Sequence, residues 1–143
     1  MLDWLFGGKK DEDKESQGHF VDINILHQHV SNTLSTVEGI ANDLESEYSK
    51  EALVMISRRF EGISKEYHDY TLVEASSFYE VMHRSASRLS AAKKVAQESR
   101  NVAQLFERYA RNPKSYSAVN SRFKINNLSG ALKNLRTYCS SAV

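Results

Sequence analysis

Apolar side chains recur every three or four residues along most of the chain, which is the spacing of one helix face. The first stripe begins after residue 19 and predicts a helix over about 20–47. A second stripe follows a heptad spacing from Leu53 to Tyr70 and predicts a helix over about 50–70. Both stripes are expected to pack against other helices of one bundle.

The longest helical pattern runs from Thr71 to Arg111 and contains neither Gly nor Pro. Thr71 and Glu74 have the spacing of a capping box, in which two side chains satisfy free N–H groups at a helix start. Arg111 and the Asn-Pro step after it supply a cation, a left-handed cap and a residue that ends the helix. We therefore expect a third helix over about 72–111. The serines of Ser85–Ser90 offer an alternative in which this helix divides in two.

The links between these helices are short, and short links favour antiparallel neighbours. The third helix outruns the second, so the apolar stripe of its far half needs a cover. Two short helical patterns after Pro113, divided by Asn126-Asn127, supply that cover, and a homodimer through the overhanging end is the alternative. The predicted fold class is an all-α, antiparallel helical bundle with three principal helices and a short helical C-terminal tail.

The chain opens with an apolar tip on a polar tether, and these two parts make up residues 1–18. Residues 7–18 have no large apolar member, so this stretch is expected to be flexible. Residues 19–143 form the single bundle domain. The predicted docking tip consists of Leu2, Trp4, Leu5, Phe6, Lys9 and Lys10.

The composition of the tip suits three interpretations. Trp4 and Phe6 match the headgroup level of a membrane, while Lys9 and Lys10 match anionic lipid. The same tip is suited to a groove on a partner protein, with Trp4 as its anchor. In the third interpretation the tip folds back onto its own bundle or stays disordered.

Charge is unevenly distributed, although the formal net charge is only +1. Residues 19–70 carry four Lys/Arg and nine Asp/Glu, whereas residues 71–143 carry twelve and four. Lys93, Arg100 and Arg111 are seven and eleven residues apart, which stacks them along one line of a helix. The predicted basic surface consists of Lys93, Arg100, Arg108, Arg111, Lys114, Arg122 and Lys124.

Three interpretations of this basic surface stay open. Cations interleaved with Tyr109, Tyr116 and Phe123 are suited to a phosphate backbone and its bases, although core packing explains these aromatic residues more simply. An acidic protein or lipid surface is the second interpretation. In the third, the cations are a solvated face that the acidic first half partly balances.

Candidate catalytic and metal-binding patterns are weak. Glu80 and His83 have the Glu-x-x-His step of bundle-type di-iron sites, but no second copy of the step occurs. Histidine phosphotransfer domains are helical bundles of this size, but the residues after His83 do not match their signature. Cys139, as the single cysteine, excludes an intramolecular disulfide and fits a reducing cytosol. We predict no catalytic residue, metal, cofactor or small-molecule substrate.

These observations predict a non-enzymatic adaptor or accessory subunit. Its tip recruits it to a membrane surface or a larger protein assembly, and its basic C-terminal half makes a second contact. A bundle that binds nucleic acid through the basic line is the alternative, followed by a His phosphorelay or metal-binding bundle. No apolar run approaches the roughly twenty residues of a membrane span, and the start lacks a signal-peptide pattern, so the expected location is the cytoplasm, with peripheral membrane attachment as its extension.

Overall fold

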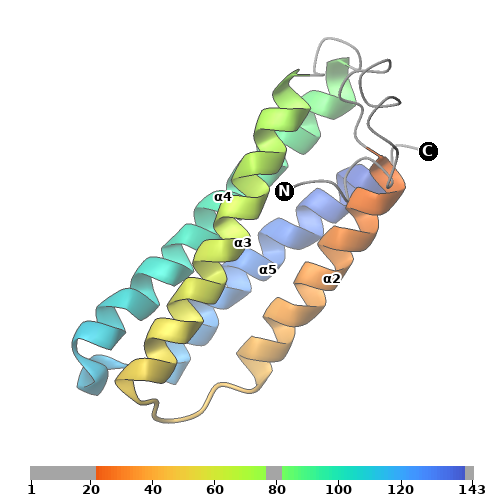
Figure 1. The fold of residues 1–143 in the computed structure, drawn as a ribbon. Helices are drawn as coiled ribbons and strands as arrows, with labels where there is room; N and C mark the ends of the chain where they lie inside the picture. The colour runs from red at the N-terminus through yellow and green to blue at the C-terminus, as the bar shows by residue number, and fades with distance from the viewer. Residues whose placement is uncertain (1–21, 77–81, 141–143) are drawn as a thin grey trace.

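The computed structural model describes residues 22–76 and 82–140, and all of its long elements are α-helices (Figure 1). The described parts contain no strand, so the predicted all-α bundle is confirmed. Figure 1 shows neighbouring helices running in alternating directions, with the α2–α3 connection at the same end as the α4–α5 connection. The elements are α2 (Ile23–Asn42), α3 (Lys50–Ser76), α4 (Met82–Arg111), the 3₁₀ turn η3 (Pro113–Ser115) and α5 (Ala118–Ser140).

Helix α2 begins at a side-chain cap and ends earlier than the predicted residue 47. The Asp22 carboxylate accepts hydrogen bonds from the backbone N–H groups of the next turn, and the chain leaves the helix at Asp43. Leu44 and Tyr48 lie in the connection, yet both pack against the core. They therefore keep the apolar spacing of a helix without belonging to one, which explains the error.

The predicted boundary between the second and third helices is wrong, because α3 continues through Thr71 to Ser76. Thr71 is buried, and its hydroxyl donates back to the carbonyl of His68 instead of capping a new helix. Helix α4 starts at Met82 and runs without a break, so the alternative division at Ser85–Ser90 is also wrong.

The C-terminal tail is one helix of 23 residues, and the predicted division at Asn126-Asn127 does not occur. Ile125, Leu128 and Leu132 form one fully buried stripe that crosses the Asn pair, while both Asn side chains face solvent. The tail is therefore a full member of the bundle and the fourth α-helix among the described residues.

Helix α5 supplies the cover that the far half of α4 needs. Val95, Val102 and Phe106 of α4 are fully buried within a single copy of the chain. The helices that pack along their lengths are α3 with α4, α4 with α5, and α2 with α5. The alternative cover by a second copy is thus not required for this stripe.

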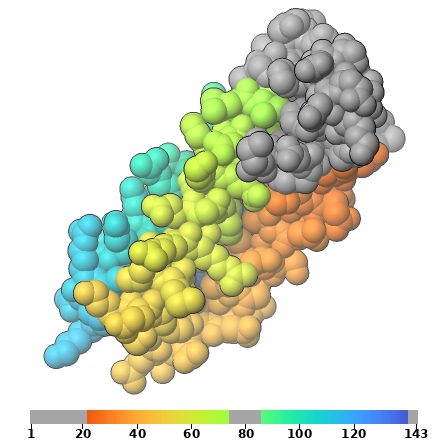
Figure 2. Space-filling view, in the orientation of Figure 1, coloured from red at the N-terminus to blue at the C-terminus, as the bar shows by residue number. Residues whose placement is uncertain are grey.

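Side chains, more than close backbone packing, join α2 to α3. The Tyr67 hydroxyl on α3 donates to the Thr33 hydroxyl on α2 over 3.0 Å. His29 Nε2 lies 2.8 Å from Glu66 Oε1, so a second polar contact crosses the same seam. The two helices leave a surface groove beside these contacts, and Figure 2 shows the face on which it lies.

Candidate binding surface along the seam of α3 and α4

Small side chains bring α3 and α4 close together. The Ser57 hydroxyl donates to the carbonyl of Ala103 over 2.7 Å, and the Ser64 hydroxyl donates to the carbonyl of Ala96 over 2.8 Å. Ser57 and Ser64 are seven residues apart on α3, and the two carbonyl groups that they contact are also seven residues apart on α4. Both hydrogen bonds therefore lie on one line along the seam. Longer side chains are displaced to the rim of this seam, where they line a groove.

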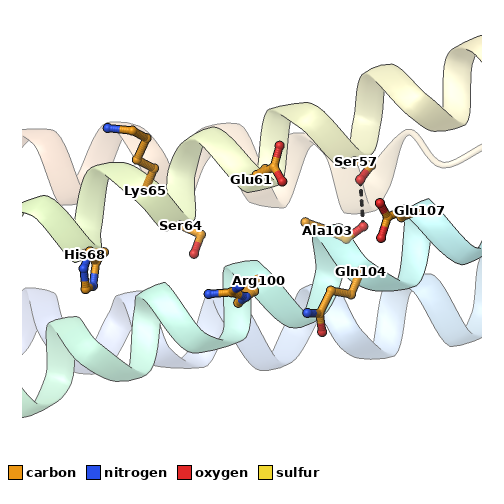
Figure 3. Close-up of a pocket in the computed structure, with 9 residues that line it drawn as sticks. All are labelled: Ser57, Glu61, Ser64, Lys65, His68, Arg100, Ala103, Gln104 and Glu107. Carbon is orange, nitrogen blue, oxygen red and sulfur yellow. Dashed lines mark hydrogen bonds between the residues drawn. The ribbon is translucent and has the colours of Figure 1, made fainter.

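The groove continues along the outside of the seam through two adjoining hollows of about 400 and 410 Å³. Both hollows share Ser64, His68 and Arg100. Figure 3 shows His68 on α3 and Arg100 on α4, with Glu107 toward the other end of the first hollow. The second hollow extends the groove to Lys93 and exposed Leu72.

The two ends of this groove differ in charge. Lys93 and Arg100 line the second hollow, whereas the first also contains Glu61 and Glu107. Arg111 Nη2 lies 3.7 Å from Glu107 Oε1, which partly balances the acidic end. No ion pair joins Lys93 or Arg100 to a carboxylate in the described parts of the chain.

The predicted basic surface divides into two groups. Lys93, Arg100, Arg108 and Arg111 are exposed on α4, and exposed Lys114 follows in η3. The other group lies on α5. These are Arg122, whose Nε donates to the carbonyl of Ala41 over 3.3 Å, and half-buried Lys124.

Among the described residues, the acidic first half of the bundle pairs with the basic second half at one point. Within the described residues, the ion pair that joins the two halves is Lys133 Nζ with Glu38 Oε2, at 3.5 Å. The other pairs lie within one half, such as Lys94 with Glu98. Exposed cations on α4 are therefore available to a partner.

The aromatic residues that alternate with these cations have different roles. Tyr109 is buried, and half-buried Tyr116 packs edge-on against Tyr48 with ring centroids 5.2 Å apart. The Tyr116 hydroxyl donates to the backbone carbonyl of Glu45 over 2.7 Å, and burial raises the pKa of Tyr116 to about 12. The interpretation as core is thus supported for the two tyrosines.

Phe123 is the exception, because 64% of it is exposed. Val119, one helical turn away on α5, is 72% exposed. Ser121 and Ile125 are buried and face the core of the bundle. Phe123 and Val119 lie two positions from a buried residue, and such a step on a helix turns a side chain away from the core. The interpretation of Phe123 as core is therefore wrong, and Phe123 and Val119 form a small exposed apolar patch.

The remaining candidates from the sequence do not form a metal site within the described residues. No group of three or more His, Cys, Asp or Glu side chains in the described ranges is placed to hold a metal ion. Cys139 is buried. The predicted docking tip, Glu80 and the side chain of His83 lie outside the residues that the structure describes.

Comparison of the chain with protein-family models, with curated proteins and with solved structures finds no match. Among the described helices, none has both the length and the apolar composition needed to cross a membrane.

Proposed function

We propose that this protein is a non-enzymatic binding module that attaches peripherally to an anionic membrane surface from the cytoplasmic side. The apolar tip at residues 2–6 makes the first contact, and the exposed cations of α4 make the second. The observation that carries the proposal is that Lys93, Arg100, Arg108 and Lys114 are exposed and form no ion pair with a described carboxylate.

The layout of these cations suits a surface of repeated negative charges. Lys93 and Arg108 are 15 residues apart, which corresponds to about 23 Å along a helix. A cation held near an anionic bilayer contributes about 1 kcal/mol to binding. The tip alone would bind weakly because a single turn buries little apolar area, but two weak contacts on one chain reinforce each other.

Flotation with anionic and neutral vesicles tests this proposal. We expect the intact chain to float with anionic vesicles. The Trp4→Ser/Phe6→Ser variant should lose the apolar contact, and Lys93→Gln/Arg100→Gln should weaken binding about thirtyfold, since two cations contribute about 2 kcal/mol. Failure of the intact chain to float with anionic vesicles would show that the proposal is wrong.

The matched control is Lys50→Gln/Arg58→Gln, which removes the same charge from exposed positions on α3. This control should bind anionic vesicles as the intact chain does. Equal loss in both double variants would show that net charge, and not the α4 surface, determines binding.

A second candidate function is binding of single-stranded nucleic acid, and exposed Phe123 favours it. Its ring stands between Arg122 and Lys124 in the sequence, and bases stack on such exposed aromatic rings beside cations. This function predicts binding that falls steeply with added salt and weakens in Phe123→Ala. Attachment through the apolar tip should be comparatively salt-tolerant.

A further inference from the structure

The groove between α2 and α3 lies on a different seam from the basic surface. It has a volume of about 550 Å³. Ile40 on α2 and Ile56 on α3 contribute half-buried apolar walls, and 70% of Met55 is exposed. Figure 2 shows the surface hollowed between α2, in orange, and α3, in yellow.

This groove stays open because one of the α2 residues that line it is a glycine. Gly39 has no side chain, and a Cβ atom built there would meet nothing within 4 Å. The hydrogen bond between Tyr67 and Thr33 joins the two helices further from their connection. An apolar segment therefore has room to lie against Ile40 and Met55.

We propose that this groove binds the apolar tip of the same chain, residues 2–6, when no membrane is present. The span that the chain must cross supports this occupant. Asp22 caps α2, and Gly39 lies 17 residues further on, which corresponds to about 26 Å of helix. Residues 7–21 separate the tip from Asp22, and a flexible linker of that length has a root-mean-square end-to-end distance of about 21 Å.

A linker whose average length is close to the span gives the highest effective concentration of one end at the other, in the millimolar range for short linkers. A contact that is too weak to bind a separate peptide can then form in most molecules when both partners belong to one chain. The groove therefore needs only modest complementarity to bind the tip.

Side-chain chemistry supplies that complementarity. The tip offers Trp4 and Phe6 to the apolar walls, and aromatic side chains are the usual anchors of such grooves. The groove lining includes one charge of each sign, Asp43 and Arg59. Asp3 is the acidic residue among the apolar residues of the tip. We expect its carboxylate to pair with the oppositely charged guanidinium of Arg59.

Fluorescence of Trp4 tests the proposal directly, because Trp4 is the single tryptophan of the chain. In the intact protein without vesicles, we expect blue-shifted emission and quenching by acrylamide several-fold weaker than in the urea-unfolded chain. Both values should be independent of protein concentration, since the tip and the groove belong to one molecule.

The variant Gly39→Gln/Met55→Lys fills the groove and adds a charge to it. It should retain the fold, because position 39 has open space, Met55 is exposed, and Gln favours a helix more than Gly does. We expect its Trp4 emission and quenching to match those of the unfolded chain. Far-ultraviolet circular dichroism checks that the bundle is intact.

The matched control is Gly130→Gln/Val119→Lys on α5, which makes the same kinds of change at open, exposed positions away from the groove. This control should leave Trp4 shielded. The proposal is overturned if Trp4 in the intact protein is as accessible as in urea, if the groove variant leaves Trp4 shielded, or if shielding requires a second copy and so grows with concentration. Flotation tests membrane binding separately, so failure of either proposal is recognised without the other.

Discussion

The hydroxyl of Tyr67 donates a hydrogen bond of 3.0 Å to the hydroxyl of Thr33, and this bond joins α3 to α2 inside the bundle. The Thr33 hydroxyl in turn donates to the carbonyl of His29 over 3.0 Å, so it accepts one hydrogen bond and donates another. Because these helices pack loosely elsewhere, the bond fixes their relative position at one end of the groove.

Removal of this bond should destabilise the fold modestly. We expect Tyr67→Phe to lower the free energy of unfolding by about 1 kcal/mol, because the buried Thr33 hydroxyl loses a partner. Urea unfolding of Tyr67→Phe, Thr33→Val and the double variant forms a cycle that isolates the coupling. Additive losses would show that the two hydroxyl groups do not interact in solution.

Alkaline pH should destabilise the bundle through its buried tyrosines. Burial raises the pKa of Tyr67 above its ordinary value and that of Tyr116 to about 12, so both stay protonated in the folded state. Their contribution is complete below the unfolded pKa of about 10 and is lost as pH rises through the folded value, with a slope of at most about 1.4 kcal/mol per pH unit for each tyrosine. Urea midpoints between pH 9 and 12, as rough limits, measure this slope, and Tyr67→Phe should flatten it.

The close seam of α3 and α4 should tolerate loss of a hydroxyl better than gain of bulk. Ser64→Ala removes one hydrogen bond and should cost about 1 kcal/mol, whereas Ser64→Leu forces the helices apart and should cost about 1–3 kcal/mol. Thermal or urea unfolding measures both. Ser90→Leu, at an exposed position of α4, is the control and should stay near the stability of the parent.

Removal of two different cations of the predicted basic surface should affect the stability of the fold differently. Arg122 donates to the last turn of α2, so Arg122→Gln should lower the free energy of unfolding by about 1 kcal/mol. Exposed Lys114 makes no such contact with a described residue, and Lys114→Gln should change the free energy of unfolding by less than about 0.5 kcal/mol. Equal effects in urea unfolding would mean that the guanidinium of Arg122 does not support α2.

Helical periodicity was sufficient to predict the fold class, but it did not identify where helices begin and end. Leu44 and Tyr48 imitate a helix from within a connection because loop side chains also seek the core. The spacing of Thr71 and Glu74 imitates a helix start, although the Thr71 hydroxyl satisfies a carbonyl of its own helix. Whether such a local pattern marks the start or end of a helix depends on which side chains the tertiary structure buries. The sequence of one segment does not reveal that.

Part of the candidate surface could be predicted from spacing. Lys93, Arg100 and Arg111 share one line on α4 because helix geometry fixes their angles. The presence of His68 in the same groove depends on how α3 and α4 align, and that alignment is a tertiary property. A usable signal existed in the heptad spacing of Ser57 and Ser64, which is typical of a closely packed seam.

The pairing of α2 with α5 has a consequence for how the chain is made. The apolar face of α2, with Leu26, Val30 and Val37, meets its partner helix only in the last described residues of the chain. During synthesis α3 and α4 are complete as an antiparallel pair well before α5 exists. Helix α2 therefore keeps an unburied apolar face until α5 has been synthesised, and premature release of the nascent chain before α5 would yield an aggregation-prone product.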